Sequence, residues 1–351
     1  MERDILSKIK INMLSSADSV EGQGVGSAYL EQVKLVSEGL SDKFEVSVNA
    51  KVKADITHIH TIEPKNYWKM LRSKGTTVSY VHFLPTTLDG SIKLPKPIFF
   101  ILKKYVISFY NHADHLVVVN PIFMNDLEKC GIDRNKISYI PNYVSKADFY
   151  KKSKDEINVI KDQYGIKHDA FVVLGVGQVQ TRKGVLDFIE VAKSLPDVTF
   201  VWAGGFSFGK ITDGYEELKK IVENPPANVK FTGIIPRTSM NDMFNLADIL
   251  FMPSFNELFP MAILEAVNLE KPLLLRNLEL YEDILFNKYM LGSNVAEFAT
   301  GIQLLKNDKE TYDKHAKYSK EISEYYSKEN VCEIWRKFYT TINDEHKKKH
   351  S

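Results

Sequence analysis

The sequence predicts an α/β protein built from two doubly wound, Rossmann-like domains that face each other across a cleft. Short apolar, β-rich runs alternate with helical periods along all 351 residues. These runs are continuously apolar, which indicates parallel strands covered by helices on both faces. The series also restarts after the highly charged segment 151–161. We therefore expect two sheets in place of one.

The first domain is expected to span residues 1–150. Its first strand leads into a glycine-rich turn and a helix over about 28–40, and a second helix is expected near 67–73. A long amphipathic stretch precedes the strand HLVVVN, and ISYIPNYV forms the tail of this half. The β-rich runs lie at 8–14, 44–50, 55–61, 76–83, 115–120 and 137–144.

The second domain is expected to span residues 151–327, followed by a closing helix over 328–345. In open parallel sheets, ligands bind beyond the carboxyl ends of the strands, so functional residues are expected just after strands. The β-rich runs of this half lie at 170–177, 198–205, 228–233, 248–254 and 271–277, and its helices at 185–194, 241–246 and 260–269.

Composition and charge exclude several classes of protein. The formal net charge is +1, so no overall field favours nucleic acid as a partner. The two cysteines, Cys130 and Cys332, have no metal or redox spacing and indicate a reduced, intracellular setting. The N-terminus lacks a signal-peptide core, and no apolar run reaches the roughly 20 residues of a spanning helix. We expect a cytoplasmic protein that meets a membrane only from its surface.

The first candidate site is the turn EGQGVGS, which contains Gly22, Gly24 and Gly26. Glycines allow the backbone to approach a ligand at a helix N-terminus, where free N–H groups favour anions. The spacing is G-x-G-x-G and not the dinucleotide pattern G-x-G-x-x-G, which disfavours a dehydrogenase. A simple flexible turn explains the glycines equally well.

The second candidate site is the turn GQVQTRKG, where Arg182 and Lys183 stand between a strand and a helix. Cations gain nothing from the dipole at a helix start, and a negative ligand would offset that conflict. A diphosphate fits, because Lys is a point charge and Arg a fork for phosphate oxygens. A solvated basic turn is the alternative, and this segment alone does not separate the two.

The third candidate site is SFNELFPMAILEA, where Glu257 and Glu265 flank an uncharged stretch. Pro260 suits the first turn of a helix, and the N–H groups of Met261 to Ile263 could hold a phosphate. This set suits a sugar nucleotide, with Glu265 on a ribose and Glu257 on the transferred sugar. The alternative makes Glu257 a helix-start acid and Glu265 an exposed face residue. The strand–loop–helix context favours the ligand site.

In this order, the motifs resemble the retaining glycosyltransferases of family four, which have the GT-B fold. The motifs are the glycine-rich first turn, G-x-x-x-x-R-K-G, the FTG strand end, AD-x-x-x-x-PS and two glutamates separated by seven residues. The likeness covers most of the chain and is strongest over 171–277. It implies that the closing helix crosses back onto the first domain and permits hinge closure.

The resemblance implies roles for individual residues. Glu257 matches the acid that contacts the donor sugar, Glu265 the ribose ligand and Lys183 the diphosphate lysine. His82 matches a histidine near the sugar and the acceptor, although a lone histidine at a strand end is more often structural. The other positions expected to bind donor are Gly24, Arg182, the backbone near Ile234 and Ile235, Phe259, Pro260 and Met261.

The sequence also departs from the family. Gln178 stands where many relatives have arginine, and Arg182 is expected to replace that missing cation of the diphosphate site. Leu258 and Pro260 replace glycines, and LLLRNLELY replaces a small-residue turn. The resemblance implies no metal and no cofactor, and no Asp-x-Asp occurs in the chain. It further implies a UDP-sugar donor, an α-glycoside product and a departing phosphate that takes the acceptor proton.

The acceptor is predicted from a basic, aromatic stretch of the first domain. The region 65–104 holds eight Lys or Arg and one acid, which suits a helix in the interface of an anionic membrane. A core helix with lysines outside is an alternative of equal weight. The residues expected to contact lipid are Lys93, Lys96, Phe99, Phe100, Lys103 and Lys104.

The segments YVHFLPTTLDGSIKLP, ADHLVVVNPIFMNDL and LLLRNLELY also resemble bacterial glycolipid synthases of the family. This likeness implies a lipid acceptor, either diacylglycerol or glucosyl-diacylglycerol, on the inner face of the plasma membrane. The sugar is glucose or galactose, and the sequence does not decide between them. Two alternatives remain open: a soluble or polyprenyl-linked cell-wall or capsule saccharide as acceptor, and an inactive scaffold that binds sugar nucleotide.

Overall fold

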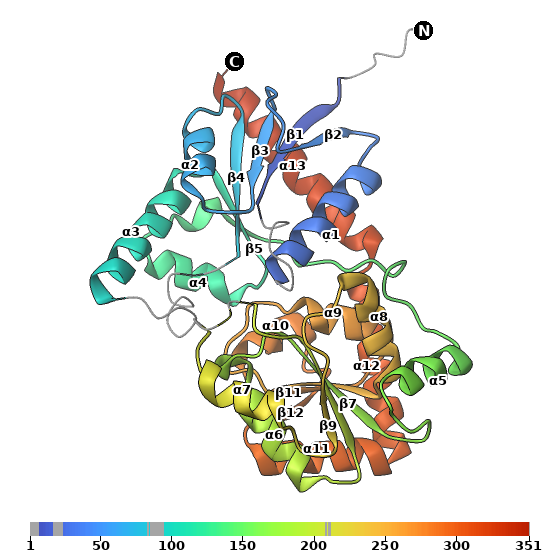
Figure 1. Ribbon diagram of the computed structural model, residues 1–351. Coiled ribbons are helices and arrows are strands. Elements are labelled where there is room, and N and C mark those ends of the chain that lie inside the picture. The colour runs from blue at the N-terminus through green and yellow to red at the C-terminus, as the bar shows by residue number, and fades with distance from the viewer. Residues whose placement is uncertain are drawn as a thin grey trace, which may run out of the picture.

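The structure is a computed structural model, and it describes residues 7–16, 24–82, 84, 95–207, 209 and 212–350. Within these residues the chain forms two parallel sheets of six strands each, with helices on both faces. Figure 1 shows the two sheets in separate bodies, one above the other, joined by a linker and by the closing helix. The predicted fold of two doubly wound α/β domains is confirmed.

The first sheet has the strand order β2-β1-β3-β4-β5-β6, and all its neighbouring strands are parallel. Its central strands are buried along their whole length, as expected for a sheet covered on two faces. The strands are β1 (Ile9–Leu14), β2 (Phe44–Val48), β3 (Ile56–Ile59), β4 (Thr76–Val81), β5 (His115–Val118) and β6 (Ile137–Tyr139). The helices are α1 (Gly24–Gly39), α2 (Pro64–Leu71), α3 (Lys96–His112) and α4 (Ile122–Lys129), with the 3-10 turn η2 (Arg134–Lys136).

The second sheet has the order β12-β11-β10-β7-β8-β9 and is also parallel. Its strands are β7 (Val172–Val176), β8 (Thr199–Ala203), β9 (Val229–Phe231), β10 (Ile249–Met252), β11 (Leu273–Arg276) and β12 (Met290–Gly292). Its helices are α5 (Lys154–Gln163), α6 (Val185–Ser194), α7 (Tyr215–Glu223), α8 (Arg237–Leu246), α9 (Met261–Asn268), α10 (Glu282–Leu285), α11 (Val295–Asn307) and α12 (Lys309–Tyr325). Two more 3-10 turns are η3 (Thr181–Lys183) and η5 (Glu279–Tyr281).

Several elements differ from the sequence prediction. The first helix begins at Gly24 and so includes part of the glycine-rich turn. Helix α8 begins at Arg237, four residues earlier than expected, because Pro236 stands at its N-cap in an extended conformation that ends the preceding loop. The edge strand β12 and the helices α11 and α12 were not predicted individually. The three residues of β12 are too few to show an apolar period, which explains why pattern alone misses this strand.

The closing helix α13 (Lys328–His350) leaves the second domain and packs on α1 and β4 of the first. Its Trp335 and Tyr339 are buried, and the Tyr339 ring lies 5.8 Å from the ring of Phe44. Arg336 makes two hydrogen bonds to the carboxylate of Asp42, of 2.7 and 3.0 Å. The predicted return of the last helix to the first domain is confirmed.

Polar side chains join the two domains where strands of both sheets end. The Asn120 amide donates to the carbonyl oxygens of Leu258 and Leu280, at 3.2 and 2.7 Å. The Asn142 amide donates to the carbonyl of Phe259 at 3.1 Å. Asn120 follows β5, Asn142 follows β6, and Leu258 follows β10. The carboxyl ends of the two sheets therefore meet, which is where ligands of such sheets bind.

Candidate active site

Lys183 and Glu257 form a buried ion pair beyond the ends of β7 and β10, which are neighbours in the second sheet. The Lys183 Nζ lies 2.5 Å from the Glu257 Oε1, and the two side chains are 12% and 7% exposed. Burial lowers the pKa of Lys183, while the carboxylate of Glu257 acts in the opposite direction. A buried pair of this kind is costly to desolvate and adds little stability, so its place in the fold points to function.

The turn that carries Lys183 is fixed by close backbone contacts. Gly184 has a φ of +72°, and a Cβ at this residue would lie 2.2 Å from the carbonyl oxygen of Pro253. Only glycine fits there. The Phe255 amide also donates to the carbonyl of Arg182 at 2.8 Å. The lysine turn and the Glu257 loop are therefore tied together by the main chain.

Arg182 and Gln178 lie in the same turn. The Arg182 Nη1 donates to the carbonyl of Asn256 at 3.0 Å, and its Nε is buried without a hydrogen-bond partner in the described part of the chain. The Gln180 side chain donates to that of Gln178 at 2.6 Å. Arg182 thus has an N–H group free to donate a hydrogen bond beside Lys183, whereas the Gln178 side chain already accepts one from Gln180.

Arg276, at the end of β11, contacts the loop that carries Glu257. It was not predicted as a site residue. Its Nε donates to the Pro253 carbonyl at 2.7 Å, and its guanidinium lies 3.8 Å from the centre of the Phe255 ring. It also forms an ion pair with Asp187 and is 7% exposed. The sequence could have revealed Arg276 as a site residue, because it is a charged residue at the end of a buried apolar strand.

Helix α9 begins at Met261 with Pro260 as its N-cap. The Ile263 amide donates to the Pro260 carbonyl at 3.1 Å, so the amides of Met261 and Ala262 are the better candidates to hold an anion. Phe259 is buried, and its ring lies 5.2 Å from that of Tyr326. Its position shapes the loop, because the Asn142 amide holds its carbonyl.

Glu265 faces inward from α9 and is 3% exposed, which excludes the alternative of an exposed face residue. The Arg237 Nη1 lies 2.6 Å from the Glu265 Oε1. Burial raises the pKa of Glu265, and the adjacent guanidinium counteracts this effect. Arg237 was not predicted, since nothing in its local sequence points to Glu265.

His82 lies just past the end of β4, in a stack of rings at the carboxyl edge of the first sheet. Its ring centre lies 4.6 Å from that of Tyr80 and 5.7 Å from that of His60, and its Nε2 is 3.4 Å from the His60 Nδ1. Burial lowers the pKa of His82 to about 3, so its imidazole is neutral at physiological pH. The Tyr80 hydroxyl donates to the Asn142 side chain at 3.1 Å, which links this stack to Phe259.

The remaining predicted donor residues also come after strands, one in the first domain and two in the second. Gly24 is the first residue of α1. Ile235 follows β9 and is half-buried, whereas Ile234 is exposed. The structure thus joins Lys183 to Glu257 directly. Of the other predicted donor residues, Arg182, Ile235, Phe259 and Pro260 lie on turns and loops after strands, whereas Gly24, Met261 and Glu265 lie in helices α1 and α9.

Comparisons with known proteins agree with this geometry. A family model described as Glycosyltransferase Family 4 matches residues 39–147, and one described as Glycosyl transferases group 1 matches residues 156–322. The chain is 45% identical to the α-galactosylglucosyldiacylglycerol synthase of Streptococcus pneumoniae, over 96% of this chain and 92% of that protein. The chain belongs to glycosyltransferase family 4.

Other similar proteins share less of the sequence. The processive diacylglycerol α-glucosyltransferase of Acholeplasma laidlawii is 26% identical over 86% of this chain and 90% of its own. Among solved structures, Anabaena HepE with UDP and glucose superposes with a TM-score of 0.74 at 16% identity, covering 95% of this chain and 99% of that one. Sucrose-phosphate synthase of Thermosynechococcus elongatus gives 0.79 at 13% identity, covering 95% and 99%. These structures support the GT-B fold.

The predicted lipid-contacting residues of this glycosyltransferase lie on α3, except Lys93, which is outside the described residues. Lys96, Phe100 and Lys104 are exposed, and Phe99 and Lys103 are half-buried. The alternative of a core helix with lysines outside fits the second half of α3, where Val106, Phe109 and Tyr110 are buried. In the first half, the apolar side chains of Ile98, Phe100 and Ile101 are exposed instead. No described helix has both the length and the apolar character needed to cross a bilayer.

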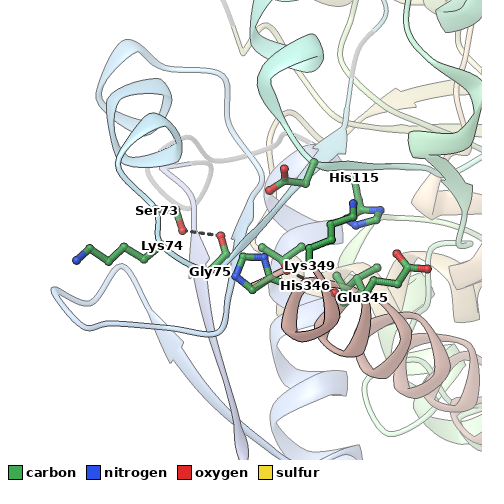
Figure 2. Close-up of a pocket in the computed structure, with 10 residues that line it drawn as sticks. Ser73, Lys74, Gly75, His115, Glu345, His346 and Lys349 are labelled. Carbon is green, nitrogen blue, oxygen red and sulfur yellow. Dashed lines mark hydrogen bonds between the residues drawn. The ribbon is translucent and has the colours of Figure 1, made fainter. Parts of the chain in front are cut away.

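Two hollows lie apart from the Lys183–Glu257 pair. The larger, of about 560 Å³, is lined by the starts of β4 and β5 and the last turns of α13, with His115, Glu345 and Lys349 around it in Figure 2. Strand starts lie at the opposite edge of a sheet from strand ends, so this hollow is remote from the chemistry. A second, of about 410 Å³, lies between α4 and η5–α10 at the domain border.

Among the described residues no group of three or more His, Cys, Asp or Glu could hold a metal ion.

Proposed function

We propose that this family 4 glycosyltransferase transfers galactose from UDP-galactose to glucosyl-diacylglycerol, with retention of the α configuration. The observation that carries the proposal is the 45% identity to the pneumococcal α-galactosylglucosyldiacylglycerol synthase along nearly the whole of both chains. The name of that relative describes a product with galactose on glucosyl-diacylglycerol. Its A. laidlawii relative is also named for a diacylglycerol acceptor.

The donor site we propose is built on the second domain. Lys183 and the amides of Met261 and Ala262 would hold the diphosphate. Arg182 would add a second cation, which replaces the arginine that many relatives have at the position of Gln178. Glu265 would accept hydrogen bonds from the ribose hydroxyls, and the backbone at Ile235 would contact the base. Gly24, at the start of α1, would let the main chain approach the phosphates.

The reaction we propose breaks the bond between C1 of the galactose and the diphosphate oxygen, and forms a bond from C1 to the acceptor oxygen on the same face. The departing phosphate oxygen takes the proton of the acceptor hydroxyl. Lys183 and the α9 amides would stabilise the charge that develops on that diphosphate. Glu257 would accept hydrogen bonds from sugar hydroxyls and hold the buried lysine in place. Neutral His82 would position a sugar hydroxyl without supplying a proton.

The acceptor would be reached from a membrane, through a surface that we call the basic face. It comprises exposed residues of α2 and α3, two helices that lie on one side of the first domain in Figure 1. Trp68, Leu71, Ile98, Phe100 and Ile101 are each more than half exposed. The basic residues among them include Lys65, Lys69, Arg72, Lys96 and Lys104, with Arg72 over the Trp68 ring and Lys104 over the Phe100 ring.

Exposed aromatic residues mixed with cations suit the interface of an anionic bilayer, where rings enter the headgroup region and cations meet lipid phosphate. Such a protein would be peripheral, on the inner face of the plasma membrane where UDP-sugars are made. This arrangement would deliver the sugar of a glycolipid to the cleft while its acyl chains stay in the bilayer.

The test is transfer from radiolabelled UDP-galactose or UDP-glucose to vesicles containing glucosyl-diacylglycerol, diacylglycerol or neither, with products separated by chromatography. The expected result is a labelled diglycosyl lipid from UDP-galactose and glucosyl-diacylglycerol, and background with Glu257→Ala. Label only from UDP-glucose would overturn the choice of sugar. Label only in a water-soluble or polyprenyl-linked saccharide would overturn the lipid acceptor, and no transfer to any acceptor would favour a scaffold.

A further inference from the structure

Arg237 joins two buried carboxylates that come from different domains. Its Nη1 lies 2.6 Å from the Glu265 Oε1 and its Nη2 lies 2.7 Å from the Glu31 Oε1. Glu265 stands on α9 of the second domain, and Glu31 stands on α1 of the first. The side chains of Glu31 and Glu265 are 5% and 4% exposed. One guanidinium therefore serves both carboxylates at the border between the domains.

This fork also contacts the linker between the domains. The Ser145 amide donates to the Glu31 Oε2 at 3.1 Å, and the Arg237 guanidinium lies 5.1 Å from the centre of the Phe149 ring. The Asn268 side chain, at the end of α9, donates to the Val144 carbonyl at 3.0 Å. Helix α1, the linker and α9 thus meet at this point.

The arrangement is unfavourable for stability alone. Arg237 is the first residue of α8, where the helix dipole disfavours a cation. Two acidic side chains that are 5% and 4% exposed share one guanidinium that is itself 30% exposed. The site therefore removes two acids from water for a single cation, which costs desolvation free energy. The two terminal nitrogens of a guanidinium are needed to contact both carboxylates at once, so lysine cannot replace Arg237. Such a costly arrangement is expected where a charge must be held in one orientation for a ligand.

We infer that Arg237 is a positioning residue that orients the Glu265 carboxylate for the ribose of the donor and, through Glu31, couples that orientation to the placement of the two domains. Arg237 takes the Oε1 of Glu265, and the Oε2 of the same carboxylate receives the ribose hydroxyl. Loss of Glu31 loosens the fork from the first domain, so donor binding weakens although Glu31 touches no donor atom. This inference rests on the proposed ribose role of Glu265.

The experiment measures UDP affinity by titration calorimetry and the KM and kcat for UDP-galactose in four variants. Arg237→Gln and Glu31→Gln are each expected to weaken UDP binding about fivefold or more and to raise the donor KM more than they lower kcat. The double variant is expected to be no weaker than Arg237→Gln alone, because both residues act through one fork. Lys34→Gln is the matched control. Its exposed pair with Asp148, at 2.9 Å, also joins α1 to the linker, and UDP affinity should not change.

Glu265→Gln separates this inference from the proposed function. If Glu265→Gln leaves UDP affinity intact, the ribose role itself is wrong. If Glu265→Gln weakens UDP binding while Glu31→Gln and Arg237→Gln do not, the ribose role stands and the positioning role of Arg237 is overturned. Additive losses in the double variant would also contradict a shared fork. Should Arg237→Gln fail to fold by circular dichroism, Glu31→Gln decides alone, because it keeps a neutral hydrogen-bonding side chain.

Discussion

The carboxyl edges of the two sheets, which meet at the domain border, carry opposite kinds of residue. On the second domain, the residues beyond the strand ends are charged and paired, as in Lys183 with Glu257 and Arg276 with Asp187. On the first domain, the residues at the sheet edge form a stack of neutral rings. His60 and Tyr80 lie 5.2 Å apart between ring centres, and His82 lies 4.6 Å from Tyr80.

The difference fits what we propose that each side binds. A diphosphate leaving group requires fixed positive charge, and charges are effective where water is excluded. An acceptor hydroxyl that passes its proton to that phosphate requires neutral hydrogen-bonding groups. Burial keeps the pKa values of His58 and His82 at about 3, so neither ring competes for the proton. The four predictions below challenge this contrast, starting from the largest expected effect.

Glu257→Gln should reduce kcat most, by about a thousandfold, because it removes the charge partner of a buried lysine and a ligand of the sugar. Radiolabelled transfer measures the effect. The matched control is Glu270→Gln at the end of α9, whose carboxylate makes an exposed pair with Lys151 and whose loss should leave kcat unchanged. If the Glu257→Gln enzyme keeps a tenth of the wild-type rate, the Lys183–Glu257 pair is not required for the chemical step.

Arg276→Lys should lower kcat/KM about thirtyfold and the free energy of unfolding by about 3 kcal/mol, because lysine keeps the charge but loses the fork that holds Pro253 and Asp187. Steady-state kinetics and urea denaturation give the two values. If stability falls while kcat/KM is unchanged, Arg276 supports the sheet and has no part in placing the Glu257 loop.

Reversing two charges of the basic face, Lys96→Glu with Lys104→Glu, should weaken binding to anionic vesicles at least about tenfold, since each lysine near such a surface contributes about 1 kcal/mol. Co-sedimentation at low salt measures it. Lys317→Glu with Lys320→Glu is the control, because both lysines are exposed on α12 of the second domain. Equal losses in the two double variants would mean that net charge, and not the basic face, governs vesicle binding.

The ring stack should make the protein less stable in acid. Burial holds the pKa of His58, His60 and His82 below 6.5 in the folded state, whereas the unfolded chain takes up these protons as pH falls through about 6.5. The unfolded state therefore binds more protons, and the free energy of unfolding falls by at most about 1.4 kcal/mol per pH unit for each histidine.

Urea denaturation at several pH values between 7.5 and 5 tests this effect. His60→Asn should flatten the dependence, and His168→Asn, at a half-exposed pair with Asp162, should not. A wild-type protein whose stability is constant over this range would show that the histidines are not held neutral by the fold.

The charged side of the cleft could be predicted from sequence because its residues follow strands that are neighbours in the sheet. Lys183 follows β7 and Glu257 follows β10, and strand periodicity places both at one edge. The fold was predictable for the same reason: eleven of the twelve described strands coincide with apolar runs that the sequence shows, and these runs set the alternation with helices.

The neutral side and the domain border could not be predicted, because their contacts join distant parts of the chain. His58 meets Tyr339 across 281 residues, at 2.7 Å between Nδ1 and the hydroxyl. Arg237 meets Glu31 across 206 residues. Single residues of these types carry no pattern of their own, so His60 and Arg237 become visible only when the elements are assembled.

The most direct test of the donor site is a crystal structure of the protein with UDP. We expect the diphosphate within about 3 Å of the Lys183 Nζ and of the Met261 and Ala262 amides, and a ribose hydroxyl at similar distance from the Glu265 carboxylate. A nucleotide bound away from the ends of β7 and β10, or a Glu265 that points away from the ribose, would contradict the proposal that these charged residues hold the donor.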